Sequence, residues 1–286
     1  MDEKDWHILE ILMEEQSITQ TAKRLFFSQP SLSGKIKQIE KEFGCEIVIR
    51  EPRGITFTAQ GKILARYAAH FRSEMQQIKE DINNTNKEVC GVLSIGCSNI
   101  FAKYLLPSIL KKFLERYPQV DIHVKTGLSQ EIYNQIFNGH IQIGIIRGNY
   151  PWSGKKLILQ KDPFCIVNLH PININNLPKL PLIHRHTDKP LQTSINNWWM
   201  AHFKEPPYMH MEVDSLDSCI QMVTEGLGYA ILSELSIKES PLLWSERLTF
   251  SDKTLLTRTT WAYLHEKHKG NRLVETFYDF LENYTI

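Results

Sequence analysis

The stretch from Ser17 to Phe43 constrains the fold of this chain most, because its pattern predicts two short helices joined by a tight turn. The first helix is expected from Ile18 to Leu25, with Ser17 as its N-cap and apolar residues three or four positions apart. The second begins after Ser28, and its inward residues are predicted to be Leu32, Ile36, Ile39 and Phe43. A proline in its first turn is harmless, because first-turn N–H groups have no intrahelical partner. An ordinary amphipathic helix pair is the alternative that this pattern alone leaves open.

A predicted β-hairpin after the helix pair favours a DNA-binding interpretation. Residues Glu46 to Thr58 form two β-branched runs around a Pro-Arg-Gly turn, which places Arg50 and Arg53 near the tip of the hairpin. A helix-turn-helix followed by a basic hairpin is a winged helix. Short polar side chains lie at the start of the second helix, where a recognition helix meets base edges, and cations follow for phosphates.

The combination AKRLFFSQPSLSGKIKQIEKEFG and IVIREPRGITFTAQG resembles the N-terminal domain of LysR-type transcriptional regulators. The order of elements further on is similar to that family over essentially the whole chain. Many relatives have an arginine at the position of Gly34, so a phosphate contact is either missing here or supplied by Lys35. Relatives also commonly carry an acidic residue where Gln142 stands, so this chain lacks that negative charge near its expected ligand site, unless the position is a structural one. We expect DNA contacts from Thr19, Arg24, Ser28, Gln29, Ser31, Ser33, Lys35, Lys37, Arg50 and Arg53.

Charge and cysteine content limit the other interpretations. The chain has 286 residues and a formal net charge of only +1, so affinity for double-stranded DNA must come from local basic clusters. No run approaches the roughly 18 apolar residues of a membrane span, and the charged N-terminus does not resemble a signal peptide, so we expect a cytoplasmic protein without membrane contact. Its five cysteines are scattered, which suits reduced thiols. Redox sensing, with Cys90 and Cys97 near each other in sequence, is kept as an alternative.

A long helix is predicted to begin after Thr58 and to run to about Asn84. Its apolar residues are separated by four and three positions in alternation, which is the spacing of a heptad seam. The helix would be about 40 Å long at about 1.5 Å per residue. We therefore expect a homodimer, with homotetramers implied by the family resemblance, and a seam formed by Leu64, Ala68, Phe71, Met75, Ile78 and Ile82. A helix packed on its own domain is the alternative, although it would usually show a wider apolar face.

The rest of the chain alternates short β-branched strands with helices, which predicts a mostly parallel sheet covered on both faces. The fold class expected is a winged helix-turn-helix, then a long dimerisation helix, then a two-lobed α/β effector-binding domain like those of periplasmic binding proteins. The expected boundaries are 1–58, 59–90 and 91–286. Lobe I would comprise 91–161 and 266–286, and lobe II would comprise 162–265.

Polar residues at strand ends and helix starts predict an anion site between the lobes. In open α/β sheets, ligands bind beyond the carboxyl ends of strands, near helix N-termini. The candidates are Ser98, Asn99, Thr126, Ser129, Arg147, His184, Ser215 and Arg258. Arg147 and Arg258 would form a guanidinium clamp for a carboxylate. These arginines and the NNWW stretch resemble regulators of central carbon metabolism that answer to citrate, so a di- or tricarboxylate is the expected effector.

Other classes of protein find less support. There is no GxSxG elbow, no GxGxxG after a strand and no P-loop, so we expect no enzyme and no cofactor. The pairs His184 with His186 and His265 with His268 lack further ligands at zinc spacing, so no metal is expected. Trp198 and Trp199 are predicted to pack in the core. A two-lobed solute-binding protein would match 91–286 but would have a signal peptide and no winged helix.

Overall fold

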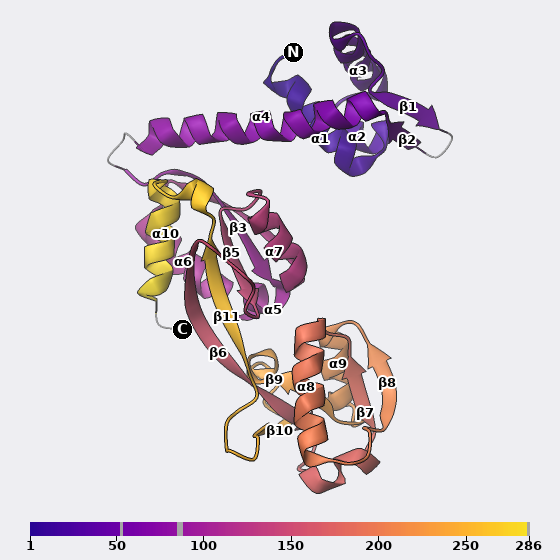
Figure 1. Cartoon of the computed structure of the whole chain (residues 1–286), viewed down its shortest axis with the longest axis vertical. Coiled ribbons are helices and arrows are strands. Elements are labelled where there is room, and N and C mark those ends of the chain that lie inside the picture. Colours follow the sequence, from indigo (N-terminus) through magenta and orange to yellow (C-terminus); the bar gives the residue numbers. More distant parts are fainter. Residues whose placement is uncertain (52–53, 85–87, 285–286) are drawn as a thin grey trace. The chain divides into compact units, whose positions relative to one another are not determined.

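The structure is a computed structural model that describes residues 1–51, 54–84 and 88–284, and Arg53 lies outside the described residues. For residues 72–73, 76–77, 79–81 and 83–84 only the backbone is described. The chain divides into two compact units, Met1–Asn86 and Lys87–Ile286 (Figure 1). The long helix belongs to the first unit, so the structure does not separate a 1–58 domain from a 59–90 linker as predicted.

The N-terminal unit is a winged helix. Its elements are α1 (Glu3–Glu15), α2 (Ile18–Arg24), α3 (Gln29–Phe43), β1 (Val48–Glu51), β2 (Gly54–Phe57) and α4 (Ala59–Asn84). The predicted caps are confirmed, since the Ser17 hydroxyl accepts from the Gln20 N–H and the Ser28 hydroxyl accepts from the Ser31 N–H, each at 3.3 Å. β1 and β2 pair antiparallel, with Val48 opposite Phe57. The helix pair and hairpin expected from the sequence are therefore present.

The core of this unit joins all four helices to the hairpin. Leu32, Ile36 and Ile39 of α3 are buried in it as predicted. Phe43 is not, because it is 43% exposed, and its ring makes a T-shaped contact with the Trp6 ring. The start of α4 is fixed by Thr58, whose hydroxyl donates to the Glu46 carbonyl at 2.6 Å and accepts from the Gly61 N–H at 2.9 Å.

The C-terminal unit contains two lobes that share a mixed seven-stranded sheet. The sheet has the order β10-β6-β11-β5-β3-β4, and β9 pairs with β6. Among the strand pairs described for this sheet, only β3–β4 and β3–β5 are parallel, so the prediction of a mostly parallel sheet is wrong. The strands are β3 (Gly91–Ser98), β4 (Val120–Gly127), β5 (Ile143–Arg147), β6 (Lys155–Asn168), β9 (Ala230–Ser233), β10 (Trp244–Arg247) and β11 (Thr257–Leu264).

In lobe I, helices cover both faces of the sheet. Its helices are α5 (Asn99–Tyr104), α6 (Leu106–Arg116), α7 (Ser129–Phe137) and α10 (Arg272–Glu282), with the short helix η3 (Glu266–His268) before α10. One core cluster packs α5, α6 and α10 on one face, and a second packs α7 on the other. The tail thus returns to lobe I, as expected.

Lobe II adds a small parallel pair of strands, β7 (Leu182–Arg185) with β8 (Met209–Val213). Around the pair lie α8 (Lys189–His202), α9 (Leu216–Thr224) and the 3-10 helices η1 (Ile174–Lys179) and η2 (Glu234–Ile237). Trp198 and Trp199 of α8 are buried in the core, which confirms their predicted role.

The long strands β6 and β11 run through both lobes (Figure 1). The first part of β11 pairs only with β6, while Thr260 to Leu264 also pair with β5 in lobe I. A register shift between Thr260 and Trp261 marks the change. Lobe II therefore ends near Thr259, and the predicted end at 265 is wrong.

Candidate nucleic-acid interface and effector site

The exposed face of α3 and the wing carries most of the residues expected to contact DNA. Gln29, Ser31 and Lys37 are exposed on α3, and Ser33 is half-buried. Thr19 is exposed on α2, Ser28 is exposed before α3, and Arg50 is exposed on β1. Arg53 lies outside the described residues. The polar N-terminal end of α3 is therefore open to a groove of duplex DNA.

Two of the expected cations are already engaged within the unit. Lys35 Nζ donates to the buried carboxylate of Asp5 at 3.1 Å, which joins α3 to α1. Arg24 Nη1 lies 2.7 Å from carboxylate oxygens of both Glu14 and Glu15. A phosphate at Lys35 would therefore have to compete with Asp5 for the lysine. Arg24 must release Glu14 and Glu15 before it can bind a phosphate.

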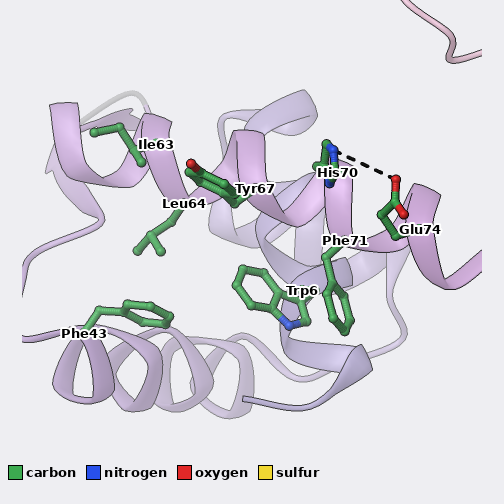
Figure 2. Close-up of a pocket in the computed structure, with 8 residues that line it drawn as sticks. All are labelled: Trp6, Phe43, Ile63, Leu64, Tyr67, His70, Phe71 and Glu74. Carbon is green, nitrogen blue, oxygen red and sulfur yellow. Dashed lines mark ion pairs between the residues drawn. The ribbon is translucent and has the colours of Figure 1, made fainter.

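An apolar groove of about 460 Å³ lies along α4 where that helix passes α1 and α3. Figure 2 shows the rings of Trp6, Phe43, Tyr67 and Phe71 around it. The Trp6 and Phe71 rings are in contact, with centroids 5.4 Å apart. Further along α4, the side chains of Ile78 and Ile82 are 50% and 61% exposed. Exposed apolar surface of this extent is typical of a protein–protein interface.

Leu64 and Ala68 are not exposed as the seam prediction required, although Leu64 lines the groove. Both are at least nine-tenths buried in the core of the N-terminal unit, because this part of α4 packs on α1. For the first half of the helix, the alternative of packing on its own domain is the correct one. Phe71, Met75, Ile78 and Ile82 remain as residues for a dimer contact.

Arg147, the last residue of β5, forms a buried ion pair between the lobes. Its side chain is 4% exposed, and its Nη2 lies 2.5 Å from Oδ2 of Asp162 on β6. Its Nη1 donates to the Ser233 hydroxyl at 3.3 Å, while its Nε is buried without a hydrogen-bond partner. Burial lowers the pKa of Arg147 to about 10, against the opposing effect of Asp162. The Arg147 guanidinium is therefore already paired with a carboxylate of the chain.

Arg258 makes a second link between the lobes. Its Nη2 donates to the Arg147 carbonyl at 2.9 Å and to the Asp188 carboxylate. Asp188 is also the N-cap of α8, since its Oδ1 accepts from the Leu191 N–H at 3.1 Å. Like Arg147, Arg258 is already paired, so an anion must compete with a carboxylate of the chain at either residue.

The remaining candidate residues for the effector site are only partly brought together. The Ser129 hydroxyl accepts from the Arg147 N–H at 3.2 Å, so it lies at the site, but Leu128 and not Ser129 occupies the N-cap of α7. Ser98 is buried at the N-cap position of α5 and its hydroxyl has no partner among the described residues. Asn99 and Thr126 are exposed at neighbouring strand ends.

The lobe II candidates lie apart from the two arginines. Ser215 caps α9 through the Ser218 N–H at 3.3 Å, and His184 is half-buried on β7. In the part of the chain that the structure describes, no hydrogen bond or ion pair joins either residue to Arg147 or Arg258. Gln142 has a structural role, because its Oε1 accepts from the Ser94 N–H at 2.8 Å.

Family models match both units of the chain. The model described as LysR substrate binding domain matches residues 86–285, and that of the bacterial regulatory helix-turn-helix protein, lysR family, matches residues 4–62. The chain belongs to the LysR family. It is therefore a DNA-binding transcription regulator with an effector-binding domain, in a family of regulators rather than enzymes.

Relatives in the LysR family align with nearly the whole chain. The "Uncharacterized HTH-type transcriptional regulator YraN" of Bacillus subtilis is 43% identical over 99% of this chain and 98% of its own length. The regulator YkuM of the same organism, also described as uncharacterized, is 30% identical over 99% of this chain and 97% of its own length.

Solved LysR-family structures show the same fold. A variant of full-length OxyR from Pseudomonas aeruginosa superposes with a TM-score of 0.67 at 20% identity, over 99% of this chain and 95% of that one. Full-length AphB of Vibrio cholerae gives a TM-score of 0.61 at 15% identity, over all of both chains.

Sequence reasoning about this LysR-family chain missed the acidic partners of the two arginines. Asp188 stands just before Lys189 and Pro190, so it could have been recognised as an N-cap from the sequence. Asp162 was harder to recognise as a partner, because in the sequence it is a single carboxylate before the apolar run from Pro163 to Val167. Its partner Arg147 is 15 positions away, and only the pairing of β5, β11 and β6 brings the two together.

The cysteines of the described structure are mostly buried. Burial raises the pKa of the Cys97 and Cys165 thiols to about 12 and that of Cys219 to about 11. A protonated, buried thiol reacts slowly with oxidants. Cys97 is thus a poor partner for a redox pair with Cys90, which disfavours the redox alternative.

The described residues contain neither a membrane-spanning helix nor a cluster of metal ligands. None of the helices described combines the length and apolar character that crossing a bilayer requires. Likewise, no group of three or more His, Cys, Asp or Glu side chains in those residues is placed to hold a metal ion.

Proposed function

We propose that this LysR-family regulator binds operator DNA as a homodimer or homotetramer and responds to a small carboxylate, a di- or tricarboxylate such as citrate. The observation that carries the proposal is the presence, in one chain, of an exposed polar end of α3 and an arginine-rich junction between two lobes. The first is suited to reading base edges and the second to sensing an anion.

The exposed end of α3 supports specific DNA binding. Gln29 and Ser31 present hydrogen-bonding groups on the first turn of α3, and their backbone is fixed by the Ser28 cap. Lys37 lies on the same helix and Arg50 on the wing, where cations contact phosphates. The base contacts would give sequence preference, and the phosphate contacts would give salt-dependent affinity.

The groove along α4 supports a homodimer. A second copy of α4 is a suitable occupant, because Met75, Ile78 and Ile82 continue an apolar strip beyond Phe71, which still contacts Trp6 of α1. Each copy would then bury its own strip against the other, and two winged helices would be held by one contact.

The junction between the lobes supports an anionic effector. Arg147 lies at the end of β5 in lobe I and is bound to Asp162. Arg258 lies on β11, which runs through both lobes, and is bound to Asp188. An incoming carboxylate can replace Asp188 at Arg258, which is 12% exposed, more readily than Asp162 at the buried Arg147. Exchange at Arg258 would break a link between the lobes and so favour a different lobe arrangement.

The test uses two variants of the full chain with opposite expected effects on citrate binding. Arg258→Gln removes a charge-assisted hydrogen bond, so citrate affinity should fall by about 10-fold to 100-fold. Asp188→Asn keeps an N-cap for α8 but removes the competing charge, so citrate affinity should rise. Calorimetry measures both affinities, and Arg247→Gln is the control, because Arg247 pairs with Glu234 on the exposed surface of lobe II.

Footprinting of operator DNA with and without citrate measures the regulatory half of the proposal. The parent should change its footprint with citrate, and Arg258→Gln should keep the basal footprint and lose the change. If the parent does not bind citrate, the effector class is wrong. If Arg258→Gln and Asp188→Asn bind citrate like the parent, the anion site lies elsewhere.

A further inference from the structure

A cavity of about 420 Å³ lies within lobe II, between α8 and the β7–β8 pair. Its volume falls in the range of about 300–1,000 Å³ typical of small-molecule sites. One face of α8 lines it with Gln192, Ile195, Asn196 and Trp199, which lie at helical spacing. Met209 of β8 is among the apolar residues of the opposite wall. Most of the lining residues are apolar, so the cavity favours a ligand with an apolar body.

Arg185, the last residue of β7, also lines this cavity and has no anionic partner. Its Nε is buried without a hydrogen bond, and no carboxylate in the described part of the chain lies within ion-pair distance of it. Asp188 is close in sequence, but its carboxylate is bound to Arg258. Burial lowers the pKa of Arg185 and the nearby Arg258 lowers it further, against the opposing effects of Cys219 and Asp188.

The acidic residue of the cavity does not supply that counter-charge. Glu212 lines the cavity from β8, directly opposite His184 in the strand pair, but its side chain is 55% exposed and lies 3.9 Å from His186. A mostly buried guanidinium without a partner costs free energy, which a bound anion would recover. The cavity thus combines apolar walls with one unneutralised cation.

We propose that this lobe II cavity is a second ligand site, separate from the interlobe arginines, for a small organic acid with an apolar body. The carboxylate binds Arg185, and the apolar body packs against Ile195, Trp199 and Met209. Thr187 and Gln192 line the same cavity and offer further hydrogen-bonding groups.

The position of α8 connects this site to the junction between the lobes. The same helix lines the cavity and begins at Asp188, whose carboxylate holds Arg258, and Arg258 in turn donates to the Arg147 carbonyl of lobe I. A ligand beneath α8 therefore acts on the interlobe link without touching it. The second ligand would then alter citrate affinity, and by linkage citrate would alter that of the second ligand equally.

The experiment compares 3-phenylpropionate with its neutral amide, 3-phenylpropionamide, on the full-length chain by calorimetry. The parent should bind the acid at least about 10-fold more tightly than the amide, because only the acid forms a charge-assisted hydrogen bond. In Arg185→Gln, acid and amide should bind equally. In Ile195→Trp, which fills the cavity, both should bind more weakly. Arg247→Gln, a loss of an exposed arginine in the same lobe, should behave like the parent.

Equal binding of acid and amide by the parent would overturn the proposal without the use of any variant. Unchanged acid binding by Arg185→Gln would overturn it as well. Citrate separates the two sites: its affinity in the absence of 3-phenylpropionate should be about the same in Arg185→Gln as in the parent. If Arg185→Gln lost affinity for citrate and for 3-phenylpropionate equally, Arg185 would belong to the interlobe site. The proposal of a separate cavity site would then be wrong.

Discussion

Phe26, between α2 and α3, has a left-handed backbone with a φ of 57° and a side chain that is 97% exposed. A bulky residue in this conformation is strained by roughly 1 kcal/mol, whereas asparagine adopts it more easily. Phe26→Asn should therefore raise the free energy of unfolding of the N-terminal unit by about 1 kcal/mol, because little packing is lost. Urea denaturation followed by circular dichroism measures the change. An unchanged or lower midpoint would contradict the strain argument.

His268, in η3, predicts a pH dependence of stability. It is buried, and burial lowers its pKa to about 4 from the ordinary value of 6.5. Above pH 6.5 the residue is neutral in both states and contributes nothing. As the pH falls from 6.5 towards 4, only the unfolded chain gains the proton, so the folded state should lose about 3 kcal/mol from this residue.

The measurement for His268 compares thermal unfolding of the parent and His268→Leu between pH 7 and pH 4. The variant lacks the titrating group, so its stability should fall less over this range. Parallel curves for the two proteins would show that His268 takes up a proton in the folded state as readily as in the unfolded state.

At the scale of elements, α4 consists of a buried half and an exposed half with different expected responses to charge. Ile78→Glu and Ile82→Glu should give monomers that are still folded, because a charge in a dimer contact costs several kcal/mol while neither residue is in the core of the described unit. Ala68→Glu should instead unfold the N-terminal unit, since Ala68 is fully buried.

Light scattering and circular dichroism together distinguish these outcomes for α4. If Ile78→Glu and Ile82→Glu keep the oligomeric state of the parent, the dimer contact lies elsewhere. Helix content as high in Ala68→Glu as in the parent would contradict the place of Ala68 in the core.

The helices were predictable from the sequence because local signals, such as N-cap residues, mark where they begin. Ser17, Ser28 and Thr58 lie at the starts of α2, α3 and α4 and make the expected hydrogen bonds. What lies opposite a helix is not a local property. The apolar spacing from Leu64 to Ile82 is continuous, so it could not show that α1 covers the first half of the strip and leaves the second half open.

At the scale of the whole molecule, the order of units was predictable and the charge pairing between distant segments was not. Strand-helix alternation indicated two lobes, but parallel and antiparallel neighbours have the same local pattern when both faces are buried. The effector candidates Arg147 and Arg258 were found from their places at strand ends. Their ion pairs with Asp162 and Asp188 depend on contacts that form only in the folded lobes.

The return of β11 to lobe I also sets the order in which the chain can fold during synthesis. The N-terminal unit is complete before β3 is made, but β5 obtains its neighbour β11 only after lobe II has been translated. At about 5–20 residues per second, the stretch from Arg147 to Thr257 takes on the order of 10 s. For that time one edge of β5 has no strand partner, which makes it open to pairing with other nascent chains. The chain is therefore expected to be most prone to mispairing between the time when β5 leaves the ribosome and the time when β11 follows it.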